Sequence, residues 1–285
     1  MHSYEAYEET IVLVPRWALV KRPVKHLGQF DSSHPEADYT GMRETLRAHL
    51  ANAETARRIR VDITYEIDRG GGPDGLLIMD YPDKSWIGKT LGQIAKARGE
   101  DPVETAIHIQ LHGFDRPGGI EFQAFAVSLD DLKEFMRKDY TAVCTDRHGD
   151  SPAIRRNPFV HPGTFGTSTR RIRRFALDEP VTSLPFAIRS MTQLSAQILG
   201  LRDRGRLAEG MKADVVVFDP ATIRDKATYF EPFQYSEGIN YVVVNGALVV
   251  DGGTPTAATP GRVLARQRTR AGMSVTTSGQ RLPEK

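Results

Sequence analysis

Residues 120–146 read IEFQAFAVSLDDLKEFMRKDYTAVCTD, and this stretch decides the fold class. The apolar and aromatic residues at 120–127 predict a strand, and Ser128 followed by Asp131 predicts the capped start of a helix that runs to about Arg137. The apolar run 141–145 predicts a second strand, which ends at Asp146. A strand, a helix and a strand within about thirty residues are typical of a βα unit of a parallel sheet, so we expect an α/β fold.

The first eighty residues or so are weakly patterned. Residues 40–59 carry apolar side chains near helical spacing and predict one charged helix. The glycine-rich segment 69–75 predicts a loop, and the apolar run 76–79 after it predicts a buried strand.

Two helices with clear end signals come next. Thr90 predicts the cap of a helix that ends at Gly99. The pair Asp101-Pro102 predicts the start of a second helix, and Gly113 predicts its end in the left-handed conformation that glycine tolerates.

The pattern changes towards the C-terminus. Two short helices are expected at 184–191 and 193–199, closed by Gly200, and from about residue 205 the apolar runs become short and β-like. Asn245-Gly246 between two such runs is the strongest short hairpin signal in the chain. We therefore expect an α/β part at 1–200, a small β part at 201–267 and a poorly ordered tail at 268–285.

Composition excludes several classes of partner and compartment. The 285 residues are 40% hydrophobic and 26% charged, and 38 basic against 36 acidic side chains leave a net charge of +2. Such a balance predicts neither a nucleic-acid nor a membrane partner. A single cysteine, no apolar segment long enough for a membrane span and no signal-peptide pattern predict a cytoplasmic protein.

Asp146 is the best candidate for chemistry. It follows a predicted strand, where α/β sheets and β/α barrels place catalytic groups, and a carboxylate there can ligate a metal or take a proton from bound water. A cap of the following loop is an equally good interpretation of its position alone. His148 and His161 flank that loop and could be ligands or substrate contacts, although single loop histidines are more often surface residues.

Two further patterns are weaker. His108 and His112 have the spacing of a helical metal pair, but apolar neighbours favour two histidines on the flank of a buried helix. The basic run 170–174 could hold a substrate carboxylate through a guanidinium group, and we expect one arginine at most, Arg170, to do so.

Several blocks in the C-terminal half resemble the D-aminoacylases (N-acyl-D-amino-acid deacylases) of the amidohydrolase superfamily. They are His161-Pro162-Gly163-Thr164-Phe165-Gly166-Thr167, Glu209-Gly210-Met211-Lys212-Ala213-Asp214, Asp225-Lys226-Ala227-Thr228, Tyr235-Ser236-Glu237-Gly238-Ile239 and Pro260-Gly261-Arg262-Val263. Weaker blocks upstream extend the resemblance over nearly the whole chain, but only to the C-terminal half of that family.

The resemblance implies a fold, a cofactor and site residues. The fold would be the C-terminal part of a (β/α)8 barrel at 1–200 with part of a small β-sandwich at 201–267, and the cofactor one or two zinc ions. Asp146 matches the family's catalytic aspartate, which also touches the metal. Tyr4 and Thr10 lie near the family's substrate-side tyrosine and hydroxyl. Together with Arg147, His161 and Arg170 they make five expected substrate contacts. Arg147 stands where the family has glycine, which puts the identity of the substrate in question.

The family's His-x-His pair and later metal histidines have no counterpart in this sequence. Because a zinc site needs at least three protein ligands, we expect a second polypeptide with the N-terminal half to hold most of the metal. The predicted function is that of a subunit of a split, heteromeric amidohydrolase, acting on N-acyl-D-amino acids or related amides, ureas or cyclic imides. The alternative is a non-catalytic scaffold or regulatory subunit derived from such a half.

Overall fold

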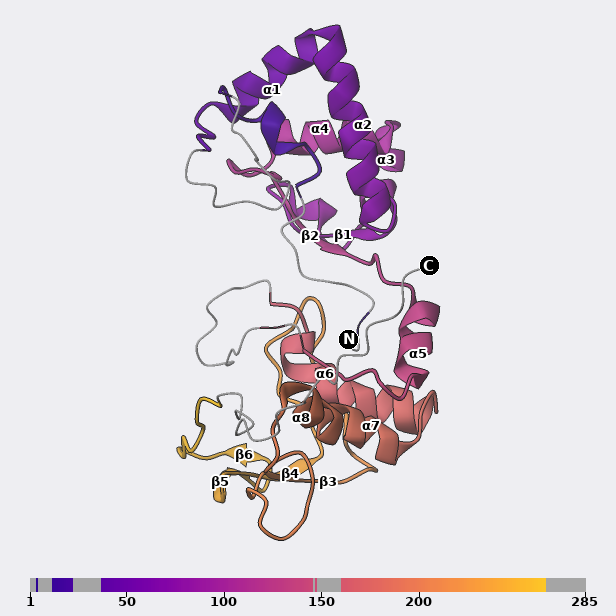
Figure 1. Ribbon diagram of the computed structural model, residues 1–285. Helices are drawn as coiled ribbons and strands as arrows, with labels where there is room; N and C mark the ends of the chain where they lie inside the picture. Colours follow the sequence, from indigo (N-terminus) through magenta and orange to yellow (C-terminus); the bar gives the residue numbers. More distant parts are fainter. Residues whose placement is uncertain (1–3, 5–11, 23–36, 146, 148–159, 265–285) are drawn as a thin grey trace, which may run out of the picture.

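The computed structural model describes residues 4, 12–22, 37–145, 147 and 160–264. Its elements form two groups along the chain (Figure 1). The first contains helices α1 to α4 and strands β1 and β2, and the second contains helices α5 to α8 and strands β3 to β6. The fold is mixed α/β, as expected, and none of the described helices is long and apolar enough to cross a bilayer.

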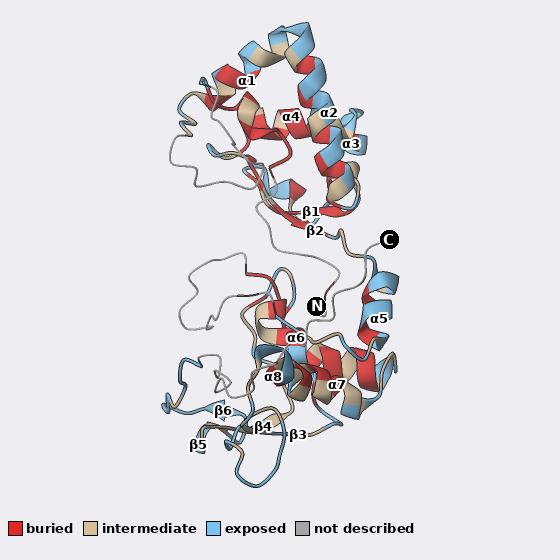
Figure 2. Ribbon diagram, in the orientation of Figure 1, coloured by how far each residue is buried: buried red, intermediate tan, exposed pale blue. Residues whose placement is uncertain are grey.

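The first group encloses the larger of two apolar cores. Helices α1 (Met42–Ala51), α2 (Ala53–Arg69), α3 (Leu91–Arg98) and α4 (Pro102–His112) surround the strand pair β1 (Leu76–Asp80) and β2 (Glu121–Ala124). Short 3-10 turns, η1 (Arg16–Ala18) and η2 (Lys84–Trp86), also belong to it. The red inner faces of these elements in Figure 2 mark that core, to which both strands contribute.

The prediction of a single helix at 40–59 is wrong, because the helix is interrupted at Asn52. Its backbone is extended (φ −93°, ψ 124°), and its side chain accepts hydrogen bonds from the backbone N–H groups of Glu54 and Thr55. Asparagine favours this capping geometry over a place inside a helix. The break lets α1 and α2 pack against each other.

The predicted βα unit at 120–146 is only partly confirmed. Strand β2 and helix α5 (Leu129–Arg137), capped by Ser128, are present, but β2 pairs antiparallel with β1. Residues 141–145 form no strand. A strand requires a neighbouring strand that satisfies its backbone groups, but here the backbone N–H of Val143 donates to the backbone oxygen of Ser190 on a helix. Among the described residues, the prediction of a parallel βα unit is therefore wrong.

The helix ends are largely as predicted. Thr90 and Gln93 form a capping box at α3, Gly99 closes it with φ 66°, and Asp101 caps α4. The left-handed end at Gly113 is wrong, since its φ is −78°. Glycine is required there for space, because a Cβ would lie 2.0 Å from the backbone oxygen of Gly119.

The second group begins with helices packed around a small core. Helix α6 (Gly163–Ile172) continues into the π-helical segment η3 (Arg173–Asp178), and α7 (Leu184–Met191) and α8 (Gln193–Leu199) follow as predicted. Leu132 and Met136 of α5 pack on Phe175 of η3. This contact joins α5 to the α6–η3 helix.

A four-stranded antiparallel sheet completes the second group. Its order is β3 (Val215–Phe218), β4 (Ile239–Val244), β5 (Ala247–Asp251) and β6 (Thr254–Pro255). The predicted hairpin is confirmed: Asn245 (φ 48°) and Gly246 (φ 83°) both have positive φ, as a type I′ turn requires. The predicted tail at 268–285 lies outside the described residues. The described strands form one two-stranded and one four-stranded sheet, so the barrel and the sandwich stay predictions.

Candidate functional site

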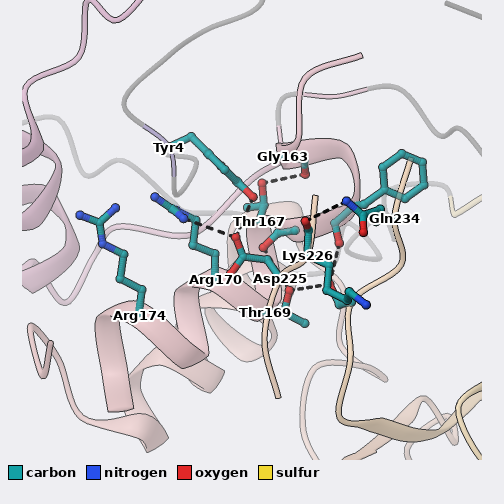
Figure 3. A network of polar contacts seen from close by, with 12 residues as sticks. Tyr4, Gly163, Thr167, Thr169, Arg170, Arg174, Asp225, Lys226 and Gln234 are labelled. Atoms are coloured by element: carbon teal, nitrogen blue, oxygen red, sulfur yellow. Dashed lines mark hydrogen bonds and ion pairs between the residues drawn. The ribbon is translucent and has the colours of Figure 1, made fainter. Parts of the chain in front are cut away.

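Five polar and aromatic side chains meet along α6, and we call them the Asp225 cluster: Tyr4, His161, Arg170, Asp225 and Tyr229. The Tyr4 hydroxyl donates to Asp225 Oδ2 at 3.2 Å, and Arg170 Nη1 donates to the same oxygen at 3.4 Å. Figure 3 shows these three side chains pointing towards one another. The Arg170 guanidinium carbon also lies 4.5 Å from the centroid of the Tyr4 ring, so the cation has an acid and an aromatic face as neighbours.

Tyr4 is held as a neutral donor. The residue is buried, and burial raises the pKa of its hydroxyl far above the ordinary value, with the negative charge of Asp225 adding to the shift. The nearby Arg170 acts in the opposite direction but does not reverse it. The phenol therefore stays protonated at neutral pH and donates to the carboxylate.

His161 presents a defined donor. It is fully buried, and its Nδ1 accepts the backbone N–H of Gly163 at 2.9 Å. Its ring stands edge-on to Tyr4 and Tyr229, with centroids 5.1 Å and 5.4 Å away. Because Nδ1 accepts, the neutral ring carries its proton on Nε2, which can donate to a carbonyl or carboxylate but cannot ligate a metal in that form.

Small residues in α6 make room for the cluster. A Cβ on Gly166 would lie 2.4 Å from the Tyr4 hydroxyl and 2.9 Å from Asp225 Cβ, so only glycine fits at this position without movement. Farther along the helix, Thr169 Oγ1 lies 2.7 Å from Ser236 Oγ, which donates to Phe165 O. These bonds tie α6 to the segment that precedes β4.

The structure brings together three of the predicted substrate contacts: Tyr4, His161 and Arg170. Arg147 is half-buried, and its Nε and Nη2 are shielded from solvent. Asp146 and Thr10, with His148, lie outside the described residues. The roles assigned to all these residues stay predictions.

The histidine pair on α4 belongs to the first group of elements. The rings of His108 and His112 are 4.3 Å apart, and Arg98 Nη2 lies 3.1 Å from His108 Nδ1. Trp86 stacks on His108 at 6.1 Å, and burial lowers the pKa of that histidine. A cation in contact with the first imidazole disfavours a metal ion there, in agreement with the interpretation of the pair as the flank of a buried helix.

Sequence reasoning missed Asp225 and Tyr229. Asp225 stands in a block that carries the family resemblance, but no role was assigned to it. It is 221 positions from Tyr4, and a single carboxylate in a loop gives no sign of such a contact. Tyr229 contacts His161 on one side and Phe125, the residue directly after β2, on the other, with ring centroids 5.4 Å and 5.0 Å away.

A metal ion does not fit the described residues alone. Zinc sites take three or four donors from histidine, cysteine, aspartate or glutamate. Within the part of the chain that the structure describes, no three such side chains converge. In the Asp225 cluster the carboxylate already accepts from Tyr4 and Arg170, and His161 offers a donor nitrogen. The described part of the cluster therefore lacks the donor set of a zinc site.

Comparison with known proteins identifies the family to which the chain belongs. The model of the amidohydrolase family matches residues 81–250. The N-acyl-D-glutamate deacylase of Alcaligenes xylosoxydans xylosoxydans is 32% identical over an alignment of 238 residues that covers 79% of this chain and 46% of that protein.

Solved structures agree with that match. A D-aminoacylase mutant in complex with copper chloride is 30% identical with a TM-score of 0.53, over 66% of this chain and 37% of that one. The N-acyl-D-glutamate deacylase of Bordetella bronchiseptica, complexed with zinc and a phosphonate inhibitor, is 31% identical with a TM-score of 0.50, over 66% and 38%. This chain thus spans less than half the length of the relatives it matches. It belongs to the amidohydrolase family, and the part that is matched belongs with the D-aminoacylases.

Proposed function

We propose that this chain is the substrate-side part of a metal-dependent amidohydrolase that hydrolyses the amide bond of N-acyl-D-amino acids or of related amides, ureas or cyclic imides. Membership of the amidohydrolase family carries the proposal. The similar proteins are deacylases, and those with bound ions contain copper or zinc.

The Asp225 cluster supports a role in substrate binding. An N-acyl-D-amino acid offers a carboxylate and an amide oxygen, and both require hydrogen-bond donors. His161 Nε2 is such a donor, and Arg170 is a cation oriented by Asp225. We assign the substrate carboxylate to this side of the site, with Arg147 shaping the pocket next to Asp146.

We further propose that a second polypeptide completes the fold and the metal site. The described elements are proposed to be the C-terminal part of a (β/α)8 barrel and one portion of a β-sandwich. A second polypeptide with the N-terminal half would supply the His-x-His pair and hold most of one or two zinc ions, to which Asp146 would add a carboxylate. The metal supplies Lewis acidity for hydrolysis when bound.

The sheet of the second group supports completion by a partner. Cross-strand neighbours share a face, so Val217 and Tyr241 lie on one face and Val216, Val242 and Val250 on the other. Both faces are apolar, yet no residue of β3 to β6 is buried. Figure 2 shows this sheet in tan and pale blue, in contrast to the red core of the first group. Apolar runs of this kind are typical of strands covered on both faces.

Co-purification tests the proposal. The tagged chain would be isolated from its native host, its partner identified by mass spectrometry, and the complex assayed for zinc and for deacylation of N-acetyl-D-glutamate. We expect a partner with a His-x-His motif and activity that requires both chains. An isolated chain that is monomeric, zinc-loaded and active would contradict the proposed partner.

Variants of the complex distinguish a catalytic subunit from a non-catalytic scaffold or regulatory subunit. Asp146→Asn is expected to abolish turnover while assembly remains. Asp68→Asn, an exposed aspartate on α2, is the matched control and should change nothing. Unchanged turnover in Asp146→Asn would instead favour the alternative of a non-catalytic scaffold or regulatory subunit.

A further inference from the structure

The basic run at the end of α6 contains one arginine unlike its neighbours. Arg170 pairs with Asp225, Arg173 with Asp178 and Arg174 with Glu179. Arg171 has no acidic partner among the described residues, and it is the largest of the side chains that are fully buried. The run therefore contains three ion pairs and one enclosed cation without a counter-charge.

The hydrogen bonds of Arg171 are incomplete. Its Nη2 donates to the backbone oxygen of Met136 at 3.2 Å, near the C-terminal end of α5. Its Nε and Nη1 are shielded from solvent, and no atom of the described residues accepts a hydrogen bond from either. A guanidinium has five N–H hydrogens, of which these two nitrogens carry three. One neutral carbonyl thus serves a group that normally takes several acceptors.

The mainly apolar neighbours of Arg171 do little to offset its buried positive charge. Met136 packs with Leu132 and Phe175 in the small apolar core of the second group. Burial lowers the pKa of Arg171 to about 10, so the side chain still carries its charge at neutral pH. Thr182, which follows the Val181 packed on that core, has a buried hydroxyl that also lacks a partner. An unpaired buried charge is strongly unfavourable, and proteins compensate it with a counter-ion or a ligand.

We propose that the Nε and Nη1 groups of Arg171 bind a small inorganic anion, such as a halide, beside the contact of α5 with η3. The site is small because the guanidinium is fully enclosed, which excludes a substrate-sized molecule. A monovalent anion neutralises the cation and accepts several N–H groups at once. Bound there, it links α6 to α5 and stabilises the fold independently of catalysis.

Halide titration of stability tests the site. The protein, in complex with its partner if it has one, would be unfolded thermally in sodium chloride, bromide or gluconate at constant ionic strength. Chloride at about one hundred times its Kd should shift the folding equilibrium of the wild type about 100-fold towards the folded state, relative to gluconate. Broadening of the chloride-35 resonance by the folded protein is expected as a second signal.

Variants give the decisive comparison. Arg171→Met removes the cation at similar length and should abolish both the chloride shift and the line broadening. Arg173→Met, which breaks an exposed ion pair instead, should keep both. Equal stability of the wild type in chloride and gluconate would overturn the site, as would a chloride shift retained in Arg171→Met. An Arg171→Met protein more stable than the wild type in every salt would mean that the charge is simply uncompensated.

Discussion

Replacing Asp225 with asparagine should weaken the link between the N-terminal segment, α6 and the loop before β4. The carboxylate is 15% exposed and the Arg170 side chain 21%, so solvent screens this pair less than a surface pair. A hydrogen bond to a charged group contributes about 1.5–3 kcal/mol, and the 3.4 Å separation argues for the lower part of that range. We expect Asp225→Asn to lower the free energy of unfolding by about 1–2 kcal/mol.

Urea unfolding followed by circular dichroism measures this change, and a double-mutant cycle with Tyr4→Phe isolates the contact with the hydroxyl. Asparagine keeps an oxygen that can accept from Tyr4, so the coupling energy should be small, about 0.5 kcal/mol, while Asp225→Ala should lose about 1 kcal/mol more than Asp225→Asn. Asp68→Asn on the exposed face of α2 is the control and should stay within about 0.5 kcal/mol of the wild type. If Asp225→Ala unfolds at the same urea concentration as the control, the cluster does not hold these segments together.

Three further predictions concern the first group of elements and the ion pairs of α5. Gly113→Ala should destabilise the protein by about 3 kcal/mol in urea unfolding, because its Cβ would meet the backbone oxygen of Gly119, which cannot move alone. Because the folded state holds the pKa of His108 below its ordinary value, stability should fall as pH drops below about 6.5, and His108→Gln should flatten that part of the pH profile. Hydrogen bonds from a lysine and an arginine hold the pKa of Glu179 at about 2, so its contribution should be present above about pH 4.5 and disappear towards pH 2, which a comparison of pH profiles with Glu179→Gln measures.

The parts of the fold that could be predicted depend on local chemistry. Thr90 and Asp101 cap helices through bonds to residues two or three positions away, and Asn245-Gly246 forms its turn without distant contacts. The break at Asn52 belongs to the same class, since asparagine before an acidic first turn is a capping signal that a search for apolar spacing overlooks. The pairing of β2 with β1 was not predictable in this way. Its partner lies more than forty residues earlier, and an apolar pattern says that a strand is buried but not beside what.

The residues of the candidate site likewise fall into those that a local sequence block reveals and those that only a long-range contact reveals. The block at His161 could be found because its residues follow one another in the chain, and the structure places that histidine beside Tyr4, whose ring also contacts Arg170. The acid that orients Arg170 could not be found, since Asp225 reaches it from a loop of the small β part. Long-range polar contacts leave no local motif in the sequence, whereas helix caps and turns do.

The strongest disagreement between pattern and burial lies in the sheet of the second group. The run Val215–Phe218 is as apolar as a strand covered on both faces, but Val216 is 56% exposed and Val217 46%. In the first group, equally apolar residues such as Leu76 and Ile78 are completely buried. Exposed valines on both faces of a sheet favour association, and a protein that kept them uncovered would tend to aggregate. The first core is thus enclosed while this sheet is exposed, and the partner that we propose would cover the sheet as well as supply the metal histidines.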